Sequence, residues 1–456
     1  MEQRQNDFSK GSMARNIVTM AIPMTMAQLV NILYSVVDRM YLGHIPGSGQ
    51  LELAGLGLSL PIISIIMGFA NLCGMGGGPL CSIHRGKGED EEAERILGNS
   101  FVLLVIFGVG IPLLFLPFRE SLLYFFGASN ATYPYAREYI TIYLLGTPFV
   151  MIGLGLNPFI NAQGFARRGM MTVLLGAVVN IILDPVLIFG FDMGIRGAAW
   201  ATVIAQAVSA AWVLKFLTGR KAILRLRTDC MPLAWPRVRR ILGLGLSGFF
   251  VNLTNSLVQV VCNKTLFFYG GDLYVSVMTV INSIREVTFM GVQGITNGAQ
   301  PVLGYNYGAK CYQRVRQGIR FTVAATVGYA ALIWAAAMLV PGVLIRIFND
   351  GPELLAAGIP AMRIYFCMFV VMSLQMVSQA IYVALGRSKS AIFFSLLRKA
   401  IINAPLTVLL AIPLGTTGVF VAEAISQLVG GLASSLTMYF TAYRPMSRLP
   451  DREKME

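Results

Sequence analysis

The sequence predicts an all-α polytopic membrane protein, with twelve transmembrane helices in two six-helix, pseudo-symmetric lobes. Three observations carry this prediction: an apolar composition, twelve apolar runs of spanning length, and an internal repeat. Of the 456 residues, 55% are hydrophobic and 13% are charged, whereas a soluble chain carries about 25% charged residues. The 2 histidines and 6 scattered cysteines form no cluster for metal or disulfide chemistry. We therefore expect no cofactor and no enzymatic activity.

The apolar runs define the predicted spans. A spanning helix needs about 20 mostly apolar residues. The segment 1–15 is polar, and no small-residue cleavage site follows the first run. We therefore expect that run to be a retained span and not a signal peptide. The runs lie at 16–42, 53–82, 96–118, 138–162, 169–190, 195–217, 238–268, 274–305, 318–342, 360–385, 390–413 and 418–442.

The distribution of basic residues predicts the orientation. One alternating set of loops, taken to include Arg398 and Lys399, holds 28 of the 36 Lys and Arg residues, and the opposite set holds five. By the positive-inside rule, both termini should lie in the cytoplasm. We assign the net charge of +14 to orientation and to anionic lipid headgroups. Membrane lipids are therefore expected partners, and nucleic acid is not.

The chain contains an internal repeat. Pro79 recurs as Pro301, Gly86 as Gly308 and Gly164 as Gly386, all at one constant offset. The repeat predicts an N-lobe at 1–217, a basic cytoplasmic linker at 218–237, and a C-lobe with its tail at 238–456. Because each half has an even number of spans, the halves should have the same orientation in the membrane. Two such lobes around a central cavity are typical of an alternating-access transporter.

Two predicted spans carry a stripe of polar residues. The first-span stripe has spacings of 4, 3, 4 and 3 along the chain and so follows one helix face: Met24, Gln28, Asn31, Ser35 and Asp38. The seventh-span stripe has similar spacing: Asn252, Asn255 or Ser256, Gln259 and Asn263. Polar groups in hydrocarbon need a partner or a water-filled cavity. We expect both stripes to line the substrate cavity, although hydrogen bonding between helices would also account for the Asn and Gln residues. Pro23 removes one helix hydrogen bond and is the predicted hinge.

Acidic residues inside the spans point to ion chemistry. Asp38 lies near one end of the first span, where a salt bridge with the adjacent Arg39 is the alternative interpretation. Asp184 lies well inside the fifth span, four residues after Asn180 on the same face. Two carboxylates that meet in a low-dielectric pocket need a proton or a cation. The two aspartates are therefore expected to exchange H⁺ or Na⁺.

The second half has its own in-span acids. Glu286 lies mid-span beside Arg285, and Glu423 lies early in the last span, where the repeat makes it the counterpart of Thr202. Glu286 and Glu423 are expected to be buried, either as a second ion site or as a structural ion pair with Arg285. We favour the structural role.

One motif is expected to be a false positive for nucleotide binding. Residues 243–248 match GxGxxG, but no strand precedes them and no acidic residue follows at the required distance. Close helix packing through small residues is the favoured interpretation.

Several segments together resemble the MATE (multidrug and toxic compound extrusion) transporters, and among them the MepA-like multidrug export proteins. These segments are VVDRMYLGHIPG, GMGGGPLCSIHRGKG, INAQGFARRG, NIILDPVLIFG and AQPVLGYNYGA. The resemblance extends over nearly the whole chain. It implies a bacterial inner-membrane protein, working as a monomer, whose two lobes rock between inward- and outward-open states. It also implies export of cationic or amphipathic drugs driven by H⁺ or Na⁺.

The resemblance also implies where the coupling ion binds. Archaeal and DinF-like members hold a cation in the first lobe, and the matching positions here are Asp38, Tyr139, Asn180, Asp184 and Thr202. The NorM branch uses acids on helices 7 and 10, which this sequence lacks. A first-lobe site is therefore expected.

Two other functions remain as alternatives. A lipid-linked saccharide flippase of the same superfamily would need a strongly cationic central cavity. Apart from the basic residues counted with the loops above, the predicted spans contain only Arg39, Lys264 and Arg285 as cations. A receptor or an intramembrane enzyme is disfavoured. A receptor needs no ion-exchange pair, and the chain has no His or Cys cluster for catalysis.

Overall fold

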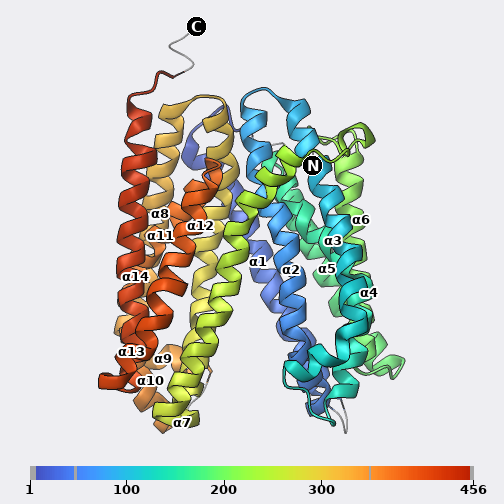
Figure 1. Cartoon of the computed structure of the whole chain (residues 1–456), viewed down its shortest axis with the longest axis vertical. Helices are drawn as coiled ribbons and strands as arrows, with labels where there is room; N and C mark the ends of the chain where they lie inside the picture. The colour runs from blue at the N-terminus through green and yellow to red at the C-terminus, as the bar shows by residue number, and fades with distance from the viewer. Residues whose placement is uncertain (1–6, 46–48, 349–350, 452–456) are drawn as a thin grey trace. The chain divides into compact units, whose positions relative to one another are not determined.

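The computed structural model describes residues 7–45, 49–348 and 351–451, and only the backbone of Asn252 and Ser256. Within these ranges the chain is helical and has no strand. The helices are α1 (Met13–Gly43), α2 (Gly49–Gly86), α3 (Asp90–Phe125), α4 (Tyr133–Ala162), α5 (Ala166–Pro185), α6 (Ile195–Thr218), α7 (Trp235–Gly308), α8 (Tyr312–Leu339), α9 (Pro341–Arg346), α10 (Pro352–Phe366), α11 (Phe369–Ala384), α12 (Ser388–Leu396), α13 (Ala404–Leu414) and α14 (Thr416–Met438), as Figure 1 shows.

The twelve predicted spans are confirmed over the described ranges. Ten helices or continuous helical segments are long and apolar enough to cross a membrane. The pair α10 and α11, bent by 45°, is also long and apolar enough when taken as one span, which makes eleven. α7 accounts for two spans, because its 74 residues contain a break at Gly271. Gly271 has φ 63° and ψ −161°, a conformation that only glycine adopts readily.

The chain forms two compact units. Among the described residues, unit 1 contains Asp7 and Met26–Gly245, and unit 2 contains Phe8–Thr25 and everything from Leu246 onward. The first part of α1 therefore belongs to unit 2, and the first part of α7 belongs to unit 1. In α1 the boundary falls two residues after Pro23.

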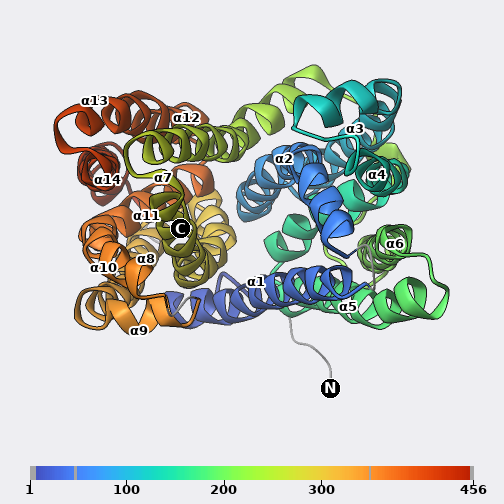
Figure 2. The same ribbon diagram turned by 90° about the horizontal axis from the view of Figure 1, so that it is seen from below.

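Each unit is a bundle of packed helices. In unit 1, α4 packs against α2, α3 and α6, and α5 packs against α6. In unit 2, α14 packs against α10, α11 and α13, and α8 packs against α11. Figure 2 shows these helices from below. The two bundles bury separate apolar cores.

Repeat-related glycines make equivalent contacts in the two units. Gly76 of α2 and Gly298 of α7 are separated by the offset of the internal repeat. A Cβ added to Gly76 would lie 2.0 Å from Ile241 O, on the first part of α7. A Cβ added to Gly298 would lie 2.6 Å from Ala21 Cα, on the first part of α1. The repeat thus extends to the packing of individual backbone atoms.

The GxGxxG motif lies inside a helix, as the packing interpretation predicted. Gly245, its second glycine, contacts α2 so closely that an added Cβ would lie 1.8 Å from Leu72 O. Gly245 therefore serves helix packing within unit 1.

Residues 218–237, predicted to be a linker, are fixed on unit 1. Gln163 Oε1 accepts hydrogen bonds from the amides of Ile223 (2.8 Å) and of the next residue (3.0 Å). Arg237 donates from Nε and Nη2 to the two oxygens of Glu92, each at 2.8 Å. This two-point pairing fixes the start of α7 against α3.

Candidate functional site

Two carboxylic acids meet inside unit 1, one on α1 and one on α5. Asp184 is fully buried and Asp38 is 8% exposed. The side chains of this acidic pair, Asp38 and Asp184, lie within hydrogen-bonding reach of each other. A hydrogen bond between two carboxyl groups requires that one of them carry a proton. The arrangement therefore suits the binding of a proton or a small cation, which removes the repulsion between two carboxylates.

Neutral polar side chains surround the acidic pair. Asn180 Nδ2 donates to Asp184 Oδ1 at 3.2 Å. Tyr139 is buried and lies near Asp38 and Thr202. The structure thus brings together the five residues predicted for the cation site, whose role in coupling stays a prediction.

Three oxygens in this cluster lack a partner. Asp38 Oδ1, Asn180 Oδ1 and Asp184 Oδ2 are buried and make no hydrogen bond within the described part of the chain. Buried polar atoms without partners are costly. Hard oxygen donors are also the ligands that Na⁺ and similar cations prefer. The three atoms are therefore ready acceptors for a proton or a cation.

Tyr34 is a member of this site that the sequence pattern did not single out. Its side chain lies near both members of the acidic pair. The available signal was spacing, because Tyr34 lies four residues before Asp38 on the same face of α1.

The first-span stripe is divided between the two units. Met24 belongs to unit 2, whereas Gln28, Asn31 and Ser35 belong to unit 1 with Asp38. Asn31 is exposed, and the side chains of Met24, Gln28 and Ser35 are half-buried.

The predicted hinge, Pro23, lies in a continuous part of α1. Thr25 Oγ1 donates to Ala21 O at 2.9 Å beside it. This side-chain bond adds to the backbone bonding where proline interrupts the helical ladder. Hinge motion itself stays a prediction.

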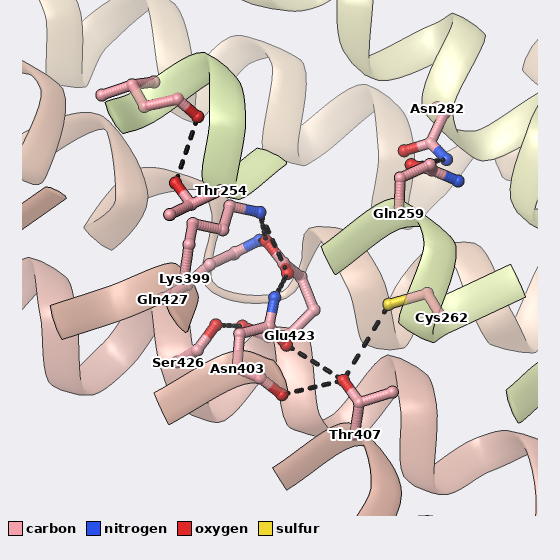
Figure 3. A network of polar contacts seen from close by, with 11 residues as sticks. Thr254, Gln259, Cys262, Asn282, Lys399, Asn403, Thr407, Glu423, Ser426 and Gln427 are labelled. Carbon is pink, nitrogen blue, oxygen red and sulfur yellow. Dashed lines mark hydrogen bonds and ion pairs between the residues drawn. The ribbon is translucent and has the colours of Figure 1, made fainter. Parts of the chain in front are cut away.

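The seventh-span stripe contains both bonded and unbonded groups. Gln259 Nε2 donates to Asn263 Oδ1 at 2.9 Å. Asn282 Nδ2 donates to Gln259 Oε1 at 3.0 Å, and Figure 3 shows the side chains of this second pair. The second of these bonds joins the two arms of α7, on either side of Gly271. Asn255 Oδ1 is buried and lacks a partner in the described structure. The side chains of Asn252 and Ser256, predicted to belong to this stripe, lie outside the described residues.

Glu423 is the centre of a second buried network, in unit 2. Its side chain accepts from Lys399 Nζ at 3.2 and 3.3 Å and from Gln427 Nε2 at 3.2 Å. Asn403 Nδ2 also donates to Glu423 Oε2. Figure 3 shows these three side chains converging on the carboxylate.

The structure corrects two expectations for the second half. Glu286 is exposed and not buried, because it lies about 100° around the helix from Arg285. Glu423 forms its ion pair with Lys399, and not with Arg285. Arg285 lies near Glu423 without an ion pair within 4.0 Å in the described residues.

The assignment of Arg398 and Lys399 to a loop is also wrong. Both are buried in a π-helical segment (Leu397–Asn403) that continues from α12 into α13. Unit 2 therefore contains three basic residues that the sequence alone did not group, Arg285, Arg398 and Lys399, called here the basic cluster.

Comparison with known proteins shows which family and which proteins the chain is similar to. The MatE family model matches residues 23–186 and 248–409. The chain is 23% identical over 434 residues to the multidrug export protein MepA of Staphylococcus haemolyticus, covering 95% of this chain and 94% of that protein. It is 24% identical over 435 residues to MepA of Staphylococcus aureus strain MSSA476, covering 95% of both.

Solved structures agree with the fold. A MATE in complex with MaL6 is 22% identical with a TM-score of 0.90, over 98% of this chain and 100% of that chain. An outward-facing multidrug resistance MATE family transporter of the MOP superfamily is 21% identical with a TM-score of 0.90, with the same coverage.

Proposed function

The chain belongs to the MatE family, and from that premise we propose that it is an ion-coupled exporter of cationic and amphipathic drugs that works by alternating access. The observation that carries the proposal is the acidic pair, Asp38 and Asp184, with its three unpartnered oxygens in unit 1. As a transporter the protein is not an enzyme. It works as a monomer among membrane lipids, without a cofactor.

The proposed coupling uses the acidic pair as an exchange site. Exporting a monovalent organic cation against 100 mV costs about 2.3 kcal/mol, and one entering H⁺ or Na⁺ offsets this cost. Binding of that ion removes the repulsion between Asp38 and Asp184. α1 then bends at Pro23, and the drug, bound against the first-span and seventh-span stripes, is released outward.

Export is tested by ethidium accumulation in cells. Cells that express the chain should accumulate less ethidium than cells with an empty vector, and an uncoupler should abolish the difference. Cells that express a transport-dead variant at equal level serve as the control. Equal accumulation with and without the expressed chain would contradict drug export.

The orientation proposal, with both termini in the cytoplasm, is tested by cysteine labelling. Thr228→Cys, on the exposed part of the 218–237 segment, should be labelled by an impermeant reagent only after cells are opened. Asn130→Cys, in the exposed segment between α3 and α4, should be labelled in intact cells. Cys311 and Cys367, the two cysteines that are not buried, are first replaced by Ser. The opposite labelling pattern would reverse the topology.

A lipid-linked saccharide flippase remains the second candidate, because unit 2 has more buried positive charge than the sequence suggested. Arg398 and Lys399 add to Arg285 inside the spans. Translocation of a lipid-linked saccharide in proteoliposomes, together with no effect on ethidium in cells, would favour this function over drug export.

A further inference from the structure

The basic cluster lies where the repeat places the counterpart of the unit 1 site. By the repeat offset, to within one position, Glu423 corresponds to Thr202. Tyr365 corresponds to Tyr143, whose ring stacks on that of Tyr139 in the unit 1 site. Glu423 and Tyr365 both lie close to Arg285 and Arg398. The two units therefore hold polar sites at corresponding positions, but with opposite charge.

The positive charge of the basic cluster is only partly neutralised. Lys399 is paired with Glu423, whose oxygens also accept from two amides. Glu286, the next acid along from Arg285, is exposed. Even when Glu286 is counted, basic groups outnumber acids by three to two among the described residues of this region. Excess charge buried in this way needs a counter-ion.

Arg398 carries the part of this charge whose donors have no partner among the described residues. The residue is 8% exposed, and its Nε and Nη1 are buried without a hydrogen-bond partner in the described structure. Arg285 Nε is likewise buried and unpartnered among the described residues. A guanidinium group offers five N–H donors in a fixed plane, a geometry that matches carboxylate and phosphate oxygens.

We propose that Arg398 and Arg285 bind an oxyanion, a carboxylate or phosphate group, inside unit 2. Gln427 Oε1 is a buried acceptor without a partner in the described part of the same network, and it can accept from the P–OH of hydrogen phosphate. Lys399 forms its ion pair with Glu423, so Arg285 and Arg398 are the donors that remain for the ligand. The proposal goes beyond drug export and does not depend on it, because it concerns a second site for ligands of the opposite charge.

A purely structural role for Arg398 makes a different prediction. The stem of Arg398 packs against α14, where a Cβ added to Gly430 would lie 2.9 Å from Arg398 Cβ. Arg398→Met keeps an apolar stem in this position and removes only the unpartnered charge. If the charge serves a ligand, the variant should be as stable as the parent without that ligand, or more stable.

The test measures the thermal unfolding midpoint of the purified full-length protein in neutral detergent. Inorganic phosphate is titrated against chloride at constant ionic strength. Phosphate should raise the midpoint of the unmodified protein by about 3 °C at saturation. Arg398→Met should lose this rise, whereas Arg363→Met, an exposed arginine of the same unit, should keep it. A second arm compares phosphatidylglycerol with phosphatidylcholine nanodiscs, because a lipid headgroup can supply the same oxyanion.

Each result decides the proposal. A rise with phosphate that depends on Arg398 supports a site for free anions, and a rise with phosphatidylglycerol alone that depends on Arg398 supports the same site for a lipid. No rise in either arm overturns the proposal, as does an unchanged rise in Arg398→Met. If Arg398→Met does not fold, Arg285→Gln decides: a lost or weakened rise supports the site, and a full rise overturns it. Because binding is measured on purified protein, failure of drug export would leave this result unaffected.

Discussion

Replacing Asp184 by Asn is expected to abolish ion-driven drug efflux while the protein remains folded and retains some drug binding. Asn cannot release a proton, and it removes one of the two charges that bind a cation. Asp38→Asn should have the same effect, because the acidic pair titrates as a unit. Stability should be preserved, because both substitutions remove a buried charge whose oxygen lacks a hydrogen-bond partner among the described residues.

Proteoliposomes with imposed pH or Na⁺ gradients provide the measurement. The unmodified protein should export drug under one of the two gradients, and that gradient identifies the coupling ion. Asp192→Asn is the matched control, because Asp192 is exposed in the same unit and its φ of 53° suits Asn as well as Asp. Gradient-driven efflux at the unmodified rate by Asp38→Asn would contradict the coupling mechanism, whichever ion is used.

The number and order of the spans could be predicted from the sequence, but their packing partners could not. Apolar runs identify spans because the bilayer demands about 20 apolar residues. They carry no information on which bundle a helix joins. The division of α1 after Thr25 and of α7 after Gly245 depends on close contacts such as those of Gly76 and Gly298, which only the structure shows.

The acidic pair could be predicted because a carboxylate deep in an apolar run is unusual and needs a partner. The basic cluster escaped prediction, because Arg398 and Lys399 were counted with the loop residues although they lie inside the predicted span 390–413. The length required of a span could have placed both residues inside the membrane. The apolar stretch 400–413 that follows them is about 21 Å long as a helix, too short for a hydrocarbon core of about 30 Å. The span must therefore include both basic residues, as its predicted bounds already do, and neither belongs to the loop count.

Glu423→Gln is expected to reduce the yield and thermal stability of folded protein. Glu423 is the only buried acid beside the basic cluster among the described residues, and it is 4% exposed. Its neutralisation leaves Lys399 without its ion-pair partner and leaves three basic groups close together. Removing one partner of a buried ion pair typically costs about 3–5 kcal/mol, a large part of a stability of about 5–15 kcal/mol.

Two further variants separate this electrostatic cost from other effects of substitution, and all are measured by thermal unfolding in detergent. Glu286→Gln, at an exposed acid on the same unit, should change stability by less than about 0.5 kcal/mol. Glu423→Gln combined with Lys399→Met should recover most of the loss, because it removes both partners of the pair. If Glu423→Gln folds and unfolds like the unmodified protein but no longer couples efflux to the gradient, then Glu423 is an ion site and not a structural counter-charge.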